Sequence, residues 1–295
     1  MEGSEGVWPG SNKTAVLPDF DSFNKQIHYI DIFNKGKTPF DFNIEASGAW
    51  IKISESSGKI EKDKRIDISV DWTKVHPGKS LGTLKITGAG TITMIDINAF
   101  NPTEITPERL KGFVEGEGVV SMEAEHFTAN IEAGNRRWVR IEDYGHTLSG
   151  MRANSEVDAP PAVPGKDSPH LEYQMYLFNT GKFDVTSTFS PTLNFMSGRA
   201  LQVAISFDDE TPRNITLVPE NYNAQNRNTD WEKTVRDNAR IVKSLHTIAT
   251  PGYHTLKIWM IDPGVVLEKV VVNTGGLKPS YLGPPESYTN FQPAL

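Results

Sequence analysis

Two glutamates stand two positions apart near the end of the run VVSMEAEHF, residues 119–127. The apolar frame of this run predicts a β-strand, and side chains alternate between the two faces of a strand. Glu123 and Glu125 are therefore expected on one face, with Met122, Ala124 and His126 on the other. Two carboxylates on one face repel each other unless a cation or water lies between them.

A metal ion is one candidate for that position. A hard cation such as Ca²⁺ takes ~6–8 oxygen ligands, often from carboxylates and backbone carbonyls. Glu123 and Glu125 can supply two of them. Glu268 can supply a third if its run, VVLEKVVV, pairs beside the first strand. The pattern predicts a metal site at these three residues, and the alternative is that all three side chains face water.

Catalysis by the same carboxylates is not expected. The acid and base of a glycosidase stand ~5–9.5 Å apart, which neighbours on one strand satisfy, but a sandwich face seldom forms a closed pocket. The seven histidines form no HExxH pair, and no GxSxG, GxGxxG or GxxxxGK[ST] motif occurs. With no cysteine in the chain, disulfides, thiolate zinc sites and cysteine nucleophiles are excluded.

Aromatic residues in polar stretches indicate a second kind of site. Trp138, Tyr144 and Trp231 lie in or beside loop-like runs such as NRRWVR and EDYGHT. An aromatic face can stack on a sugar ring while neighbouring Arg, Asn or Asp side chains bond its hydroxyls, and binding residues gather on loops. We predict a carbohydrate site there, with packing as the alternative. Trp50 and Trp259 alternate with apolar residues and are expected in the core.

Short alternating runs predict the strands that position these residues. Val, Ile, Thr and aromatic residues at period two are typical of half-buried strands, and several such strands favour β-sandwiches or jelly rolls over βαβ folds. The clearest runs cover residues 27–33, 65–72, 82–88, 91–100, 200–207 and 254–261. The run NTDWEKTVRDNAR, residues 228–240, predicts one short helix with Thr229 or Asp230 as its N-cap.

The predicted strands fall into two groups. The run NPTEITPERLKG has two prolines and no strand pattern, which is typical of a linker. We therefore expect an irregular lead-in at 1–20, a small sandwich at 21–101, a linker at 102–112 and a larger sandwich at 113–276. The tail at 277–295 is rich in proline, so it is expected to lie across a surface.

Charge and hydropathy restrict the partners. The 295 residues carry a net charge of −7 and contain no run of Lys and Arg, which argues against a sequence-independent nucleic-acid binder. No stretch of about 18 apolar residues is present, so no membrane span is expected. The first residues have neither the basic end nor the apolar core of a signal peptide. We expect a cytosolic protein, or a mature or excised piece of a longer one.

Several longer runs, in order, resemble the C-terminal domain of glycoside hydrolase family 115. They are VSMEAEHF, RRWVRIEDYGHTLSG, GYHTLKIWMIDPGVVLEKVVVNTGG and PSYLGPPES. Family members are xylan α-glucuronidases, whose catalytic barrel precedes this domain, so the resemblance assigns no catalytic residue here. It implies non-catalytic domains that support the barrel, dimerisation or glucuronoxylan binding in a secreted or periplasmic enzyme. A purely structural interface module and a free-standing carbohydrate-binding protein are the alternatives.

The resemblance also implies folds for the two sandwiches. The larger one is similar to the jelly-roll carbohydrate-binding modules of families 6 and 35, in which an EAE strand and a late LD-x-I strand hold a structural calcium ion. Glu123 and Glu125 match the first motif, and Glu268 stands where those modules usually have Asp. The smaller sandwich loosely resembles immunoglobulin-like BACON modules through GAWIKISESSGKIEKDKRIDISVDW.

Overall fold

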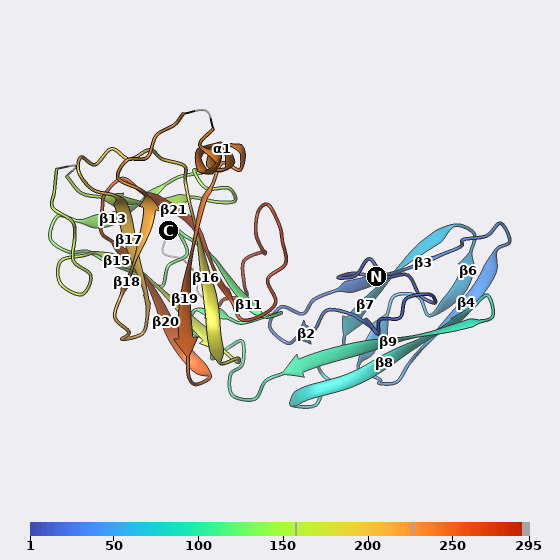
Figure 1. The fold of residues 1–295 in the computed structure, drawn as a ribbon. Helices are drawn as coiled ribbons and strands as arrows, with labels where there is room; N and C mark the ends of the chain where they lie inside the picture. The colour runs from blue at the N-terminus through green and yellow to red at the C-terminus, as the bar shows by residue number, and fades with distance from the viewer. Residues whose placement is uncertain (157, 226, 291–295) are drawn as a thin grey trace. The chain divides into compact units, whose positions relative to one another are not determined.

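The computed structural model describes residues 1–156, 158–225 and 227–290. The chain divides into two compact units, residues 1–107 and 108–295, and the division falls within the proline-containing stretch after residue 101. Figure 1 shows the first unit in blue to blue-green and the second in green to red. Both units are built from β-sheets, so the predicted all-β class with two sandwiches is confirmed.

The first unit, all of whose residues are described, contains nine strands. They are β1 (Ala15–Val16), β2 (Phe20–Asp21), β3 (His28–Phe33), β4 (Phe40–Ala46), β5 (Ile51–Ile53), β6 (Ser57–Ile60), β7 (Asp63–Val70), β8 (Gly78–Gly88) and β9 (Thr91–Asn101). One sheet has the order β1-β9-β8-β4-β6, with β2 also on β9, and the other has the order β3-β7-β5.

The core of the first unit lies between these two sheets. It contains Ile30, Phe42, Ile66, Leu84 and Ile97 among others. These residues alternate with exposed polar ones, so the period-two pattern places them on the buried face.

The expectation of an irregular lead-in is wrong in part. Strands β1 and β2 pair in parallel with β9, and Ala15, Leu17 and Phe20 are buried in the core. These strands are only two residues long, which is too short for a period-two pattern to reveal.

The described part of the second unit contains twelve strands and one helix. The strands are β10 (Phe113–Val114), β11 (Val119–Glu123), β12 (Ala129–Ile131), β13 (Arg137–Ile141), β14 (Gly150–Asn154), β15 (His170–Leu177), β16 (Gly181–Phe189), β17 (Leu201–Phe207), β18 (Arg213–Val218), β19 (Arg240–Ile248), β20 (Gly252–Met260) and β21 (Val266–Asn273). No helix of the described residues is long and apolar enough to cross a membrane.

Two six-stranded sheets enclose the core of this unit. The β15 sheet has the order β10-β15-β20-β17-β18 with β12 on β15, and the β16 sheet has the order β13-β14-β21-β16-β19 with β11 on β21. On β16, Phe183, Val185 and Phe189 point into the core, so Thr186 and Thr188 lie on the opposite, outer face of the sheet.

The helix α1 (Thr229–Arg236) lies within the predicted run but is capped differently. Asn228 is the N-cap, and its Oδ1 accepts a hydrogen bond of 3.2 Å from the Trp231 amide. Thr229 and Asp230, the predicted caps, are already helical, and the helix ends at Arg236. All three candidates have short polar side chains suited to an N-cap, so residue type alone did not distinguish them.

The tail returns to the first strands of the second unit. The backbone of Val114 donates to Tyr288 O at 3.1 Å, and Phe113 forms an antiparallel bridge with Thr289. The Thr289 hydroxyl also donates to Gly112 O at 2.8 Å. The described part of the tail is therefore tied back to the opening of this unit through Tyr288 and Thr289.

Candidate functional site

Antiparallel pairing of β11 with β21 positions the predicted glutamates. The register places Glu123 opposite Lys269, so Glu268 lies beside the end of β11, as the sequence reasoning required. However, β11 ends at Glu123, and the chain turns there, with Ala124 N donating to Glu268 O at 3.0 Å. The alternation that was predicted to place Glu123 and Glu125 on one strand face does not extend to Glu125.

Each of the three carboxylates is buried and has its own cationic or histidine partner. Glu123 Oε1 lies 2.9 Å from Lys269 Nζ, and its Oε2 accepts a 2.6 Å hydrogen bond from the Thr147 hydroxyl. Glu125 Oε2 lies 2.7 Å from Arg140 Nε, while its Oε1 accepts from the Ser149 amide at 3.1 Å. Burial of a carboxylate is unfavourable without such partners.

The third carboxylate is bound on both oxygens. Glu268 Oε2 contacts His146 Nδ1, and its Oε1 accepts a hydrogen bond of 2.5 Å from the Ser190 hydroxyl. His146 and Thr147 belong to the same loop, between β13 and β14, so this loop reaches both Glu268 and Glu123. Together with Arg140 and Ser149, it covers the end of β11.

This arrangement does not fit a shared metal ion. The described residues contain no group of three or more His, Asp or Glu side chains placed to hold one. Ca²⁺ requires several oxygens directed at one point. Here the oxygens of Glu123, Glu125 and Glu268 are directed at three separate protein donors.

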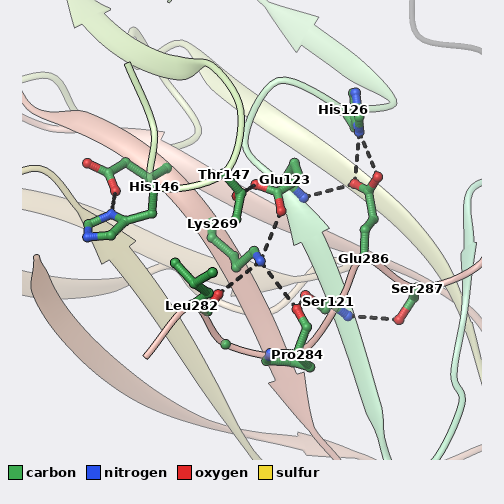
Figure 2. Close-up of polar contacts among 12 residues, drawn as sticks. Ser121, Glu123, His126, His146, Thr147, Lys269, Leu282, Pro284, Glu286 and Ser287 are labelled. Atoms are coloured by element: carbon green, nitrogen blue, oxygen red, sulfur yellow. Dashed lines mark hydrogen bonds and ion pairs between the residues drawn. The ribbon is translucent and has the colours of Figure 1, made fainter. Parts of the chain in front are cut away.

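The C-terminal segment is fastened along β11 by a row of polar contacts (Figure 2). Glu286 accepts from the Glu123 amide at 3.0 Å, and its two oxygens lie 2.8 and 2.9 Å from His126 Nδ1. Ser121 N and Ser287 Oγ are 2.9 Å apart, and Ser121 Oγ donates to Pro284 O at 3.1 Å. The hydrogen bond to Glu286 raises the pKa of His126.

A cavity of about 410 Å³ lies between this segment and the outer face of the β16 sheet. Its volume is within the ~300–1,000 Å³ range of small-molecule sites. The strand register places two rows of side chains on its floor. One row is Lys243, Thr186 and Val271, and the other is Ile241, Thr188 and Lys269.

The segment 277–284 and the loop that carries His146 form the walls of this cavity. Tyr281 is 68% exposed, and its hydroxyl donates to Asp237 O, at the C-terminal end of α1, at 3.2 Å. The hydroxyl oxygen of Thr186 is buried and has no protein partner among the described residues. The cavity thus combines an exposed aromatic ring, an unpartnered hydroxyl and the exposed ammonium of Lys243.

The sequence profile of the Glycosyl hydrolase family 115 C-terminal domain matches residues 112–286. The chain belongs to this family. The match includes both strands of the carboxylate cluster, the loop of His146 and the whole segment 277–284 that forms the cavity wall. No protein of curated function matches the chain in sequence.

The solved structures that are similar to part of the chain include a family 115 enzyme and two carbohydrate-binding modules. A family GH115 4-O-methyl-α-glucuronidase, BtGH115A, described as specific for decorated arabinogalactans, has 18% identity and a TM-score of 0.38 over 50% of this chain and 17% of that one. The C-terminal CBM6 of a laminarinase from Zobellia galactanivorans has 11% identity and a TM-score of 0.34, over 52% and 98%. A family 35 module from Clostridium thermocellum has 13% identity and a TM-score of 0.35, over 52% and 97%.

The predicted aromatic residues do not meet in this cavity. Trp138 is 2% exposed in the core, and its indole N–H donates to Pro169 O at 3.4 Å, so the prediction that it stacks on a sugar is wrong. Tyr144 is exposed on the loop of His146 but does not line the cavity. Trp231 lies on α1 and packs edge-on against Tyr222, with ring centroids 6.4 Å apart.

The sequence pattern did not predict four residues of the site, which are Lys269, Arg140, His146 and Tyr281. Lys269 had a detectable signal, because a lysine among six apolar residues in VVLEKVVV requires a partner if the strand is buried. Tyr281 lies between prolines in PSYLGPP, where the proline-rich pattern indicated a surface position but no partner. Arg140 lies on β13 and His146 on the loop that follows it, and tertiary folding that the sequence pattern did not reveal brings both to their carboxylates.

A second polar network contains the residue types of a nucleophile, a base and an acid. Ser244 Oγ lies 2.8 Å from His246 Nε2, and His246 Nδ1 contacts Glu210. His246 is 1% exposed and Ser244 is 6% exposed, and neither lines the cavity described above. Burial lowers the pKa of His246. A network without access for a substrate is structural, and it links β19 to the turn between β17 and β18.

The first unit has a larger cavity, of about 730 Å³. Its walls come from the N-terminal segment and from β3, β4, β8 and β9, and include Trp8, Phe40 and Ile86. These three side chains pack against the core of the sandwich. The family match begins at residue 112 and does not include this cavity.

Proposed function

We propose that this chain is a non-catalytic, carbohydrate-binding C-terminal region of a family 115 glycoside hydrolase. The chain spans only 17% of the solved family 115 enzyme to which it is similar. By analogy with family members, the parent is a secreted or periplasmic α-glucuronidase. The Ser244 and His246 side chains of the Ser–His–Glu network are buried, which favours a supporting role.

The cavity between the β16 sheet and residues 277–284 is the observation that carries this proposal. The ring of Tyr281 presents a flat apolar surface to the C–H groups of a sugar. The Thr188 hydroxyl can donate to and accept from sugar hydroxyls, and the Asn273 amide nitrogen can donate to them. Small-molecule sites commonly combine an apolar lining with a few polar groups in this way.

The charges of the cavity favour an acidic sugar. Lys243 and Lys278 contribute cations, while Glu268 is the only acidic side chain among the described residues that line it and is engaged by His146. A glucuronic acid side chain supplies a carboxylate that can pair with Lys243. Glucuronoxylan and arabinogalactan decorated with 4-O-methylglucuronic acid both carry such a group.

Binding to purified oligosaccharides tests the proposal. We expect the full chain to bind glucuronoxylan or decorated arabinogalactan fragments more tightly than neutral xylo-oligosaccharides in isothermal titration calorimetry. Tyr281→Ala and Lys243→Gln should each weaken binding by about tenfold. Tyr281→Phe keeps the ring and should bind normally, and Tyr144→Ala serves as an exposed control outside the cavity.

Two results would contradict this function or this location. If a folded chain binds none of these glycans at millimolar concentration, the carbohydrate-binding role is wrong. If binding occurs but neither Tyr281→Ala nor Lys243→Gln changes it, the ligand lies elsewhere on the chain. Release of glucuronic acid by the purified chain would instead show that it is itself an enzyme.

A second role, as an interface within the parent enzyme or between copies, is favoured by one surface of the first unit. Ile92 and Met94 are 61% and 48% exposed at neighbouring positions on the outer face of β9, and Leu81 is 79% exposed on the same face farther along β8, opposite Asn98. Exposed apolar patches commonly mark interaction sites. Light scattering should show association that Leu81→Gln with Met94→Gln reduces. A monomer at high concentration that also fails to bind the remainder of the parent enzyme would exclude this role.

A further inference from the structure

A buried lysine ammonium joins three segments of the second unit. Lys269 is 7% exposed on β21, the last strand. Its Nζ lies 2.9 Å from Glu123 Oε1 at the end of β11, and it donates to Leu282 O at 3.1 Å and Pro284 O at 3.2 Å in the C-terminal segment (Figure 2). One charged group therefore connects the first and the last strand of the β16 sheet, β11 and β21, with the C-terminal segment.

The three acceptors match the three hydrogens of the ammonium. A lysine has three N–H donors and no acceptor, so one carboxylate and two carbonyls leave none of them unsatisfied. Removing an ion pair from water is unfavourable unless the pairing is close and the remaining bonding groups are satisfied. Both conditions hold at Lys269.

The same oxygens are of the types that a hard metal ion selects. Carboxylate and backbone carbonyl oxygens are the ligands of Ca²⁺ in proteins, and the Thr147 hydroxyl lies against the other oxygen of Glu123. The neighbouring carboxylates offer no competing position for a metal, because Glu125 is paired with Arg140 and Glu268 contacts His146.

We propose that the Lys269 ammonium does the work of a structural metal ion in this chain. It neutralises Glu123 and holds the tail by two carbonyls, so the second unit closes without a divalent cation. The cage around it is a latent metal site. When an acidic side chain replaces the lysine, Glu123, the new carboxylate and the two carbonyls can together bind Ca²⁺. This inference does not depend on whether the cavity binds sugar.

Thermal unfolding of the full chain tests the proposal, with Ca²⁺, Mg²⁺ and EDTA as the only additions. The Tm of the unsubstituted protein should be the same in EDTA and in 10 mM CaCl₂. Lys269→Met should lower the Tm by about 10 °C, because it leaves a buried carboxylate without a counter-ion. Calcium should restore little of this loss, since only one carboxylate is present.

Lys269→Asp is the informative variant. It should be less stable than Lys269→Met in EDTA, because two carboxylates then face each other. Saturating Ca²⁺ should raise its Tm by about 5–10 °C, and Mg²⁺, which demands stricter octahedral geometry, by less. Lys182→Asp, at an exposed lysine on β16, is the matched control and should not respond to either ion.

A local readout separates tail attachment from global stability. Chymotrypsin cleavage after the exposed Tyr281 should be faster in Lys269→Met and Lys269→Asp, and Ca²⁺ should slow it only in Lys269→Asp. The proposal is overturned if Ca²⁺ stabilises the unsubstituted protein or EDTA destabilises it, because a metal would then occupy the site. It is also overturned if Lys269→Asp, folded by spectroscopy, responds to Ca²⁺ no more than Lys182→Asp does. If Lys269→Asp does not fold, the comparison of the unsubstituted protein in EDTA and in CaCl₂ still tests the proposal.

Discussion

Replacement of Glu286 by glutamine should release the C-terminal segment from β11 in a pH-dependent way. The carboxylate accepts from the Glu123 amide and lies 2.8 and 2.9 Å from His126 Nδ1. A glutamine has nearly the same shape and can still accept from the amide. The change therefore removes mainly the charge that faces His126.

The size of the effect follows from the partial burial of the pair. The side chains of His126 and Glu286 are 21% and 25% exposed. Hydrogen bonds to charged groups contribute ~1.5–3 kcal/mol, whereas exposed ion pairs contribute ~0–1 kcal/mol. We expect Glu286→Gln to lower the free energy of opening the segment by about 1.5 kcal/mol, which corresponds to about a tenfold larger open population.

The pH dependence has a definite sign. The hydrogen bond from Glu286 raises the pKa of His126 in the folded state. Its stabilising contribution is therefore complete below the unfolded value of ~6.5 and is lost as the pH rises through the folded pKa. The effect of Glu286→Gln should accordingly be large at pH 6 and small at pH 9.

Hydrogen exchange measured by mass spectrometry can follow this opening directly. Protection factors for peptides covering residues 119–124 and 280–290 should fall by about tenfold at pH 6 in Glu286→Gln and change little at pH 9. Glu132→Gln, at an exposed glutamate, is the control and should match the unsubstituted protein. Unchanged protection at pH 6, or an equal loss at both pH values, would refute the role assigned to the His126–Glu286 pair.

Three further substitutions test the packing and electrostatics of the second unit. Trp138→Ala should lower the free energy of unfolding in urea by about 3–5 kcal/mol, because it removes a buried ring from the core; a loss under 1 kcal/mol would contradict its burial. Gly276→Ala should lower it by about 2 kcal/mol, since a Cβ would lie 1.7 Å from Glu117 O, and an unchanged unfolding midpoint would show that this backbone contact is not so close. Burial lowers the pKa of His246. The contribution of neutral His246 to the free energy of unfolding is therefore complete above pH ~6.5 and is lost as the pH falls toward the folded pKa. His246→Gln should flatten the decline in this free energy between pH 7 and pH 5, and an unchanged slope would contradict the assignment.

The strands could be predicted from the sequence where the alternating pattern was long enough. Residues 91–100 and 254–261 were predicted as strands and correspond to β9 and β20 within one or two residues at each end. Strands of two residues, such as β1 and β2, show no periodicity, and their pairing with β9 depends on contacts distant in sequence. The N-cap of α1 was also missed, because three consecutive residues suit that position equally well.

Of the candidate site, only the approach of Glu123 to Glu268 could be predicted from the sequence. The sequence indicated that Glu123 and Glu268 would be brought together by strand pairing, and the register of β11 with β21 does this. It did not indicate that the counter-charges would come from the protein. A pattern of carboxylates shows where positive charge is required, but Lys269 and Arg140 reach that position through tertiary folding, which alternation along one strand does not encode.

The C-terminal segment connects the two proposals thermodynamically. Residues 277–284 form a wall of the cavity, and Leu282 and Pro284 in that wall accept from Lys269. A sugar that contacts the wall binds the closed segment in preference to the open one, so it must stabilise the closed state by its differential affinity. Weakening the attachment therefore weakens binding even where no sugar contact is lost. Two results together would establish this coupling. The glycan should protect residues 280–290 from hydrogen exchange, and the loss of glycan affinity that Glu286→Gln causes should be larger at pH 6 than at pH 9. An equal loss of affinity at both pH values would show that the attachment of the segment and the cavity act independently.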